Sequence, residues 1–520
     1  MPIIQQGSVN TTSLIVPDLY VQIVPPQNLV LNGVPTNVLG VVGTASWGPV
    51  NQPSIVSTMA DYARMFGSLN ARKFDMGTQV ATAVQQGAQN FRCIRVTDGT
   101  DTAATVSVPG TNASFSAIYT GSLGNSVAVT LGPGTKPATW QLAVSAPGLL
   151  PEVFDGLSGN GAAFWTCVAT ALSAGTGPQR GPSQLVTLNA GGTTASPTSF
   201  SLALGSTTPG SDGAASITVA NLIGQDGTTR TGMYACRGQG CGLVVLADVD
   251  DPTTWTTQAQ FGLQEGAYMI LTTPAGDTIS NAIQSIHSSG LDSYSAKLMF
   301  GDWLWWADNV NGITRLVSPQ GFAAGRLANL SPEQSSLNKQ IYGVVGSQRS
   351  GTPTAGWSSG YASAELAALL GAGVDVICNP QPAGAFWGVR GGLNTSSNPV
   401  INGDNYTRLT NYIAATLAAG MGQYVGQVIN QNLFRQIRAT QLAFLNNMLG
   451  QGLLGSVDGT MPFTVICDTS NNPLSRTSLG YVQSDAQVQY QSINERFIVN
   501  VEGGQSVQVS VQTLPSGQIS

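Results

Sequence analysis

The chain has 520 residues, of which 42% are hydrophobic and only 9% are charged, and its formal net charge is −6. That length allows roughly three or four domains, and so few charges indicate that much of the surface is buried against other copies of the chain. The negative balance excludes the basic surface of a general nucleic-acid-binding protein.

Targeting signals and cysteine usage favour assembly in a cytoplasm. Residues 1–6 lack a basic region followed by an apolar run, so we expect no signal peptide. No apolar run approaches the length of a membrane span, so we expect no membrane insertion. The six cysteines show no disulfide-framework spacing and are expected to be core thiols in a reducing compartment.

The first hundred residues predict an N-terminal arm followed by a β-α-α-β unit. The arm carries a strand at residues 19–24, which stops at Pro25 and Pro26. The unit that follows is expected to contain a buried strand over 37–43, helices over 58–67 and 76–90, and a strand over 91–96.

Between residues 101 and 225 the composition shifts to Gly, Ser, Thr, Ala and Pro, and charges become sparse. Short apolar runs at 127–131 and 217–219 predict strands joined by long loops. We interpret this segment as an inserted, mostly β domain that projects from an α/β core.

The α/β pattern resumes after the insert. Asp251 is expected to cap a helix that begins with Pro252, and a later helix is expected over 277–289. Strands are predicted over 243–247, 268–272 and 296–306. Beyond a Gly/Ser/Thr/Pro-rich loop, we expect helices over 362–370, 404–420 and 430–450 and strands over 374–378 and 463–467.

The C-terminal end again has the sequence of unpaired strands. Residues 497–501 precede a segment in which Val507, Val509 and Val511 alternate with polar residues, and no charge follows Glu502. An open strand edge at a chain end is normally blunted or paired. We interpret both ends as arms that complete a sheet in neighbouring subunits by strand addition. The alternative is two edge strands within one chain.

These elements predict a mixed α/β (α+β) fold with several domains and no solenoid repeat. The expected units are an N-terminal arm (1–30), an α/β domain (31–100 with 226–346), the inserted β-rich domain (101–225), a C-terminal α/β domain (347–496) and a C-terminal β-arm (497–520).

Catalytic motifs are present only as fragments. Residues 356–360 match the G-x-S-x-G nucleophile elbow around Ser358, but a loop precedes them and the single histidine, His287, lies upstream. A Ser-His hydrolase in the usual order is therefore excluded. None of the four lysines is followed by Ser or Thr, which excludes a Walker A phosphate loop.

Metal and cofactor sites are equally unsupported. Cys236 and Cys241 have no second pair of ligands at zinc spacing. Three aspartates that follow a strand could hold Mg²⁺, but helix capping and turn formation explain them more simply; they are Asp248, Asp250 and Asp251. We expect no catalytic residue, no cofactor and no metal.

Three motifs carry a resemblance to a known family: VPDLYVQ at 16–22, SPQGFAAG at 318–325 and FWGVRGGL at 386–393. Together with residues 33–45, 48–50, 61–67 and 90–96, and in this order, they resemble the contractile tail sheath protein of myovirus-type bacteriophages. That family's corresponding stretches read PGVYV, SP.G..AG and WGARTL. The likeness covers the first hundred residues and most of 224–513. The insert matches poorly, and the family's arginine pair is replaced by Tyr406-Thr407-Arg408-Leu409.

The resemblance implies a structural role. Sheath subunits stack as hexameric rings around an inner tube, terminal arms of different subunits join in one sheet, and contraction drives the tube through a cell envelope. The implied partners are further copies of the chain, the inner tail tube protein, and baseplate and tail terminator proteins. No nucleotide is needed, no direct nucleic-acid contact is expected, and the implied location is the virion tail, assembled in the host cytoplasm.

Residue roles also follow from the resemblance. The inter-subunit mesh would use Tyr20, Val21, Gln22 and Ile23 at one end and Val507, Val509 and Val511 at the other. Tube contact would belong to the C-terminal helices, with Arg435 and Arg438 as candidates; arginines of a solvated face are the alternative.

Alternatives from other classes stay open. Within the sheath class, the chain could belong to a phage-tail-like bacteriocin or to a secretion or injection system. An α/β hydrolase built around Ser358 would be labelled by an active-site serine probe. A secreted or surface adhesin, suggested by the Gly/Ser/Thr-rich insert, would need a signal segment.

Overall fold

A parallel sheet forms the centre of the molecule. The computed structural model describes residues 3–6, 20–23, 31, 33–178, 180–352 and 360–501. The central sheet has the strand order β19-β15-β14-β13-β3-β5-β4, and only β4 runs antiparallel to its neighbour. Its strands are β3 (Leu39–Gly43), β4 (Ser54–Val56), β5 (Phe91–Arg95), β13 (Leu243–Leu246), β14 (Tyr268–Thr272), β15 (Ala296–Met299) and β19 (Val374–Asp375).

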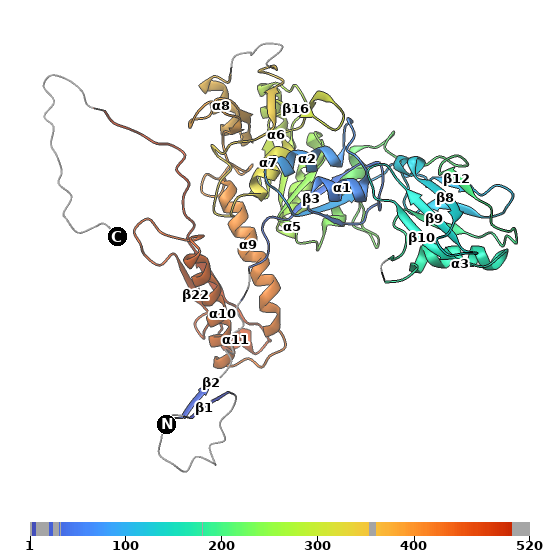
Figure 1. Cartoon of the computed structure of the whole chain (residues 1–520). Coiled ribbons are helices and arrows are strands. Elements are labelled where there is room, and N and C mark those ends of the chain that lie inside the picture. The colour runs from blue at the N-terminus through green and yellow to red at the C-terminus, as the bar shows by residue number, and fades with distance from the viewer. Residues whose placement is uncertain are drawn as a thin grey trace.

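Helices cover both faces of this sheet (Figure 1). One face packs against α1 (Met59–Phe66), α2 (Met76–Gln85) and α7 (Gln320–Ala328). The other packs against α5 (Trp255–Glu265), α6 (Ile279–Ser289) and α8 (Ser363–Gly371). The strands β3, β13, β14 and β15 are buried along their whole length, as strands between two helical layers are. The first three read as nearly continuous apolar runs, whereas β15 carries the buried Lys297.

The SPQGFAAG stretch has a packing role. It leads into α7, where Gly321 and Gly325 face α2. A Cβ on Gly325 would collide with the Cα of Ala83, and one on Gly321 with the Oγ1 of Thr82. Glycine at both positions therefore lets the two helices approach closely.

Most of the α/β elements lie where the sequence predicts them, but two expected strands are wrong. The run over 296–306 splits into β15 in the central sheet and β16 (Leu304–Asp308) in another sheet, of order β17-β16-β18. The chain turns out of the central sheet at Gly301, where a Cβ would collide with the carbonyl of Pro274. The run over 374–378 likewise divides into β19 and β20 (Ile377–Cys378). The remaining strands here are β17 (Ile313–Val317), β18 (Val344–Ser347) and β21 (Gly388–Val389), which pairs with β20.

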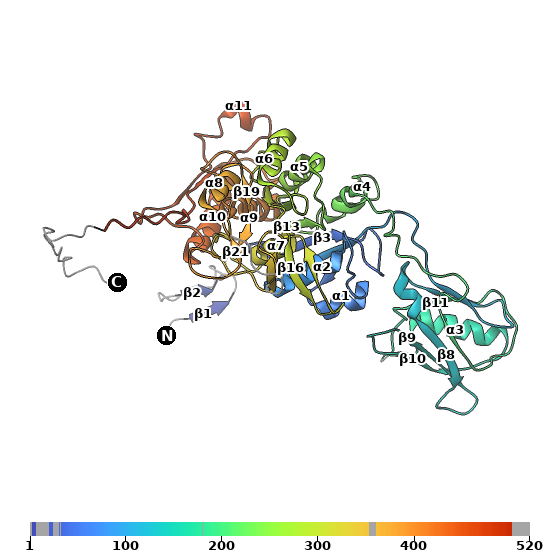
Figure 2. The ribbon, with the colours of Figure 1, turned by 90° about the horizontal axis from the view of Figure 1, so that it is seen from above.

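The insert stands to one side of the sheet with a core of its own (Figure 2). It contains a four-stranded sheet, β10-β9-β8-β12, and a three-stranded sheet, β11-β7-β6. The strands are β6 (Thr105–Ser107), β7 (Ser114–Ala117), β8 (Ala128–Pro133), β9 (Trp140–Ser145), β10 (Glu152–Leu157), β11 (Val186–Asn189) and β12 (Phe200–Ala203). A short 3-10 helix, η2 (Ser122–Ser126), precedes β8.

Two elements near the insert differ from the sequence-based expectation. Helix α3 (Ala162–Ala174) was not expected, and it buries Phe164, Trp165 and Leu172 in the insert's core. The expected strand over 217–219 is wrong, because Thr218 instead forms a capping box with Asn221 and starts α4 (Val219–Ile223). Two 3-10 helices, η3 (Gly232–Cys236) and η4 (Pro252–Thr254), then lead back into the central sheet and into α5.

The C-terminal part extends from the sheet as a helical column (Figure 1). It consists of α9 (Asp404–Met421), η5 (Gly422–Tyr424), α10 (Gln431–Gly450), β22 (Phe463–Ile466), α11 (Leu474–Thr477) and β23 (Asp485–Val488). Helices α9 and α10 begin and end within a residue or two of the predicted positions, whereas α11 was not expected. Among the described residues, no helix is long and apolar enough to cross a bilayer.

Asp75 gives the first testable prediction. It caps α2 by accepting a 2.8 Å hydrogen bond from the backbone N–H of Thr78, but burial raises its pKa to about 6. In the unfolded chain the Asp75 carboxyl has its ordinary pKa of about 4, so it loses its proton at lower pH than in the folded chain. The free energy of unfolding therefore falls as pH rises from about 4 to 6. Asp75→Asn should therefore gain on the order of 2–3 kcal/mol relative to the parent chain between pH 4 and pH 7.

Denaturant unfolding of both chains at the two pH values measures this difference. Asp75→Ala is the control, because it removes the same titrating group but also loses the cap, so it should be about 1 kcal/mol less stable than the Asn variant at either pH. A pH-independent difference between the Asn variant and the parent would refute the ionisation argument.

Candidate functional site

The helical column carries a β-hairpin whose two strands pair only with each other in the described part of the chain. Strands β22 and β23 form a two-stranded antiparallel sheet with Phe463 opposite Val488 and Ile466 opposite Asp485. One face of β22 is anchored, because Phe463 and Val465 are buried with Phe444 and Leu445 of α10. The outer edge of each strand therefore presents backbone groups that another strand could pair with.

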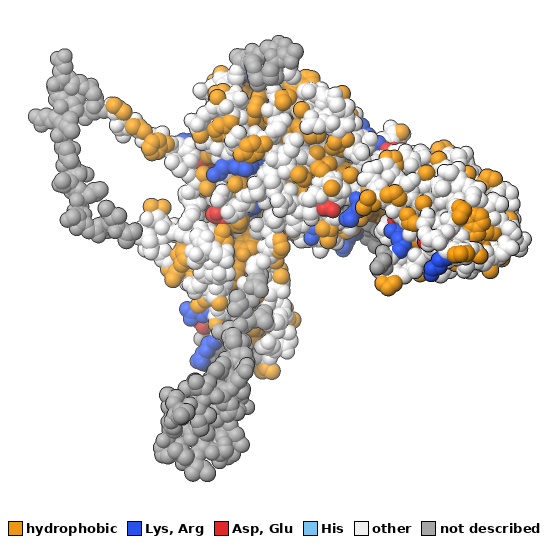
Figure 3. Space-filling model, viewed as in Figure 1, with side chains coloured by type: hydrophobic (Ala, Val, Ile, Leu, Met, Phe, Trp, Pro, Cys, Tyr) orange, Lys and Arg blue, Asp and Glu red, His pale blue; other side chains and the backbone are white. Residues whose placement is uncertain are grey.

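An exposed apolar segment leaves this hairpin. Residues 489–501 form no strand within the described chain, so the strand predicted over 497–501 is not formed in the single subunit. Phe497, Ile498, Val499 and Val501 are 63–86% exposed. In Figure 1 the end of this segment runs away from the body of the molecule, and Figure 3 shows hydrophobic side chains there. Nearer its start, the carbonyl of Gln491 accepts a hydrogen bond from the Asn405 amide. Exposed apolar residues with a strand-like sequence indicate a surface that packs against a partner.

The N-terminal arm contains the strand that the sequence predicts. Tyr20–Ile23 forms β2, which pairs in parallel with β1 (Ile3–Gln6) of the same chain, Tyr20 opposite Ile3 and Ile23 opposite Gln6. This pair belongs to no larger sheet in the described part of the chain. The C-terminal candidates Val507, Val509 and Val511 lie outside the described residues.

Arg435 and Arg438 lie on the exposed face of α10, one turn apart. Arg438 acts on Asp468: hydrogen bonds from Ser470 and then the charge of Arg438 hold the pKa of Asp468 below the usual range. In the described part of the chain neither guanidinium forms an ion pair. Two unpaired positive charges on one helix face are compatible with contact to an acidic surface. They are equally compatible with a face exposed to solvent.

A buried charged cluster fixes the column to the central sheet. Lys297 of β15 is fully buried, and its Nζ lies 2.6 Å from Asp375 Oδ2 and 3.0 Å from Asp404 Oδ1. Asp404 is the first residue of α9, where a negative charge is also favoured by the helix dipole. Its carboxylate accepts further hydrogen bonds from the hydroxyl of Tyr268 and from the backbone and hydroxyl of Ser336.

The pKa shifts show how completely this cluster is compensated. Burial alone would raise the pKa of Asp404, but Lys297 and the hydrogen bonds outweigh it and hold that pKa below its usual range. Burial alone would lower the pKa of Lys297, but the two aspartates raise it. The stabilisation is therefore lost as pH falls through the folded pKa of Asp404 or rises through that of Lys297, and it is fully present between about pH 4 and pH 10.

Arg408, at the position where the sheath family has an arginine pair, also lies inside the subunit. It is 4% exposed, and its guanidinium donates to the carbonyls of Ser331 and Leu330 at 2.9 and 2.7 Å. Burial lowers its pKa to about 10. Arg408 therefore holds α9 against the segment that follows α7, and its guanidinium is not available for contact with a neighbouring subunit.

The residues considered for chemistry have structural roles. Asp248 accepts from the backbone of Phe74 and the amide of Gln79, Asp250 pairs with Lys73 at 3.0 Å, and Asp251 caps η4. No group of metal-binding side chains occurs in the described ranges. The cysteines are free thiols, and Ser358 lies outside the described residues.

Comparison with known proteins identifies the fold. No family model and no curated protein matches the sequence. Among solved structures, a sheath tail protein from Listeria innocua matches with a TM-score of 0.58 at 14% identity, over 85% of this chain and 90% of that one. The chain has the fold of contractile sheath proteins.

Two further structures support the assignment of the sheath fold. A sheath tail protein from Desulfitobacterium hafniense matches with a TM-score of 0.56 at 14% identity, over 86% of this chain and 93% of that one. The sheath complex of the PVC extracellular contractile injection system, in its contracted state, matches with a TM-score of 0.53 at 13% identity, over 95% and 98%. The mixed α/β, multidomain prediction is confirmed.

Removing the buried lysine of this sheath fold should destabilise it strongly. Lys297→Met would leave two buried carboxylates uncompensated, so we expect a loss of about 3–5 kcal/mol in unfolding free energy. Lys73→Met is the matched control, because its pair with Asp250 is half exposed and contributes no more than ~1 kcal/mol. Denaturant unfolding at pH 7 compares the two. Equal losses would show that the buried cluster does not hold the column in place.

Proposed function

We propose that this chain is the subunit of a contractile sheath that polymerises as stacked hexameric rings around an inner tube. Its contraction would drive that tube through a cell envelope. The observation that carries the proposal is the sheath fold over most of the chain, combined with an open-edged β-hairpin and an exposed apolar segment beside it. Both features are what a subunit needs if it is completed by its neighbours.

Backbone pairing between subunits would supply the cohesion. The strand β2, with Tyr20, Val21, Gln22 and Ile23, and the C-terminal segment with Val507, Val509 and Val511 would add to the free edges of β22 and β23 in other copies. Such strand addition is independent of side-chain charge, which suits a chain with so few charged residues. The subunits would stay tethered while their domains move relative to each other.

A phage tail is the setting we propose, with the sheath assembled in the host cytoplasm and carried in the virion. The partners would be other copies of the chain, the inner tail tube, and the baseplate and terminator proteins. A tail-like injection system is the second candidate, because the matching structures include the sheath of an extracellular contractile injection system. Microscopy of particles from the producing cells, with or without a DNA-filled head, separates the two.

The insert would be a separate domain on this sheath, bounded near residues 101 and 225. Its entry and exit lie side by side, because the backbone N–H of Asp98 donates to the carbonyl of Gly213 at 2.8 Å. Its core also shares almost no residue with the central sheet. Removing it should therefore leave the rest of the subunit folded.

Deletion of the C-terminal arm tests the assembly mode. We expect the full chain to polymerise into hollow tubes, and a chain that ends at Gly503 to remain as soluble subunits, because it lacks the strand that pairs with a neighbour. Negative-stain microscopy and size-exclusion chromatography measure this. A chain in which residues 101–210 are replaced by a Gly-Ser link is the control and should still form tubes. Tubes of normal order from the truncated chain would contradict strand exchange.

Charge reversal on α10 tests the tube contact. Arg435→Glu with Arg438→Glu should abolish co-assembly with the inner tube protein while sheath polymerisation and thermal stability stay unchanged, because both side chains are exposed. Arg230→Glu, which changes an exposed arginine paired with Asp226 near the start of η3, is the control. If the parent chain, the double variant and the Arg230→Glu control all pull down the same amount of tube protein, Arg435 and Arg438 belong to a solvated face.

A further inference from the structure

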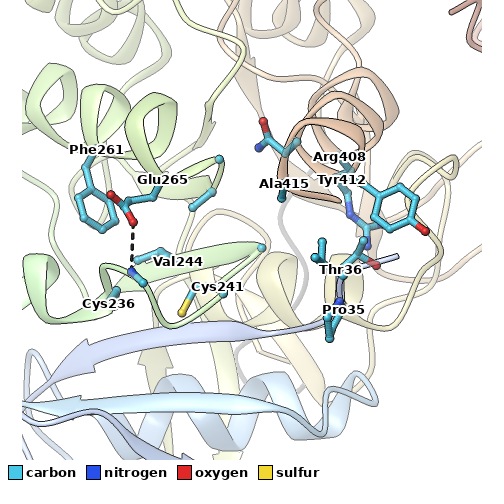
Figure 4. A pocket seen from close by; sticks show the side chains of 17 residues that line it. Pro35, Thr36, Cys236, Cys241, Val244, Phe261, Glu265, Arg408, Tyr412 and Ala415 are labelled. Atoms are coloured by element: carbon cyan, nitrogen blue, oxygen red, sulfur yellow. Dashed lines mark hydrogen bonds between the residues drawn. The ribbon is translucent and has the colours of Figure 1, made fainter. Parts of the chain in front are cut away.

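A cavity of about 370 Å³ lies where the loop after η3 meets the end of α5 and the middle of α9. Phe261 and Glu265 of α5, Tyr412 of α9, and the two cysteines Cys236 and Cys241 line it (Figure 4). The backbone N–H of Gly238 donates to the Glu265 carboxylate across this loop at 3.2 Å. The proposed sheath function makes no use of this cavity.

The thiols of Cys236 and Cys241 both lie close to one position on the central sheet. A Cβ built on Gly40 of β3 would lie 3.1 Å from the Sγ of Cys241 and 3.2 Å from the Sγ of Cys236. Both sulfurs are therefore directed at the same bare position on the central sheet, which only glycine leaves free. Both thiols are reduced in this structure, and both are almost buried, with exposed fractions of 3% and 8%.

The intervening loop holds the thiols together. Cys236 ends η3, Cys241 precedes β13, and four residues join them. Gly238 and Gly240 adopt positive φ angles of 75° and 67°, which glycine allows at little cost. The backbone N–H of Gln239 donates to the carbonyl of Cys236 at 3.1 Å and closes the turn.

The thiols also interact with each other. A side-chain hydrogen bond with Cys241 is the largest cause that raises the pKa of Cys236, followed by burial. Cys93 is close enough to contribute to the same shift, but it is 0% exposed and does not line the cavity. Among the described cysteines, Cys236 and Cys241 thus combine a thiol neighbour with access from a cavity.

We propose that Cys236 and Cys241 form a disulfide when the protein meets a small peroxide, as it would outside a reducing cytoplasm. The link would close the loop at the base of the cavity and stabilise the join between η3 and the central sheet. The inference needs only the fold, so it stands or falls separately from the sheath function.

The chemistry balances with peroxide as the oxidant. Cys241, the more exposed of the two, attacks an oxygen of hydrogen peroxide as its thiolate, the O–O bond breaks, and a sulfenic acid and one water are formed. The second thiol then attacks that sulfur, the S–O bond breaks, and a second water leaves as the S–S bond forms. Two thiols lose two electrons and two protons in all, and peroxide is reduced to two waters.

Peptide mapping of the full-length chain provides the test. The chain is reduced, freed of reductant, treated with hydrogen peroxide, alkylated and digested with trypsin without further reduction. Trypsin cuts after Arg230 and Arg237, so Cys236 and Cys241 fall in different peptides that only a disulfide holds together. We expect this linked pair, lighter by about 2 Da than the two free peptides, to form while the fully buried Cys93 stays reduced. The melting temperature should rise by on the order of 2–4 °C and return on reduction.

Three variants control the result. Cys236→Ser and Cys241→Ser should each abolish the linked pair and the rise in melting temperature. Cys378→Ser, which removes a buried thiol with no thiol partner, should change neither. Sulfinic acid at either cysteine without the linked pair would overturn the proposal. So would full alkylation of both cysteines after peroxide treatment, or earlier oxidation of Cys93.

Discussion

The ionic contact between Lys297 and the two aspartates determines how the C-terminal column leaves the central sheet. It joins β15, β19 and the first turn of α9, which share no other ion pair in the described part of the chain. Taking three charges out of water costs several kcal/mol per ion, so the arrangement persists only because every charge has a partner. Moving the first turn of α9 away from this site would leave a buried charge without one. The position of the hairpin that packs along the column therefore depends on this contact.

Charge and backbone pairing serve different purposes in this molecule. Buried charged groups lie inside the subunit, where they fix elements relative to each other: Lys297 pairs with two aspartates, and Arg408 donates to two backbone carbonyls. The outer surface is mostly uncharged, and the β22–β23 hairpin has open edges beside an exposed apolar segment. A polymer held by backbone hydrogen bonds would be less sensitive to salt than one held by surface ion pairs.

The sequence predicts the elements with strong local patterns and misses those decided by tertiary contact. The limits of β14, α9 and α10 follow from apolar runs and from caps such as Asn430. The sequence does not indicate that the chain changes sheet at Gly301, because the apolar pattern continues on both sides of this residue. Helix α3 has neither a side-chain cap nor a charged turn to mark it. Lys297 is separated from its partners by 78 and 107 residues, so no local pattern predicts the cluster. The strand at Tyr20–Ile23 is recognisable from its sequence, but its pairing with β1 is not.

Helix α9 has 18 residues and is held at its first turn. At 1.5 Å per residue it spans about 27 Å, and the β22–β23 hairpin packs along it through Phe463 and Val465, which are buried with Leu409 and Ile413. A tilt of about 10° at the buried base would displace the far end of the helix by roughly 5 Å, the spacing between neighbouring strands. The column would thus act as a lever: a small rotation of the α/β body against its neighbours would move the tip of the column by a full strand-width and the hairpin beside it by less.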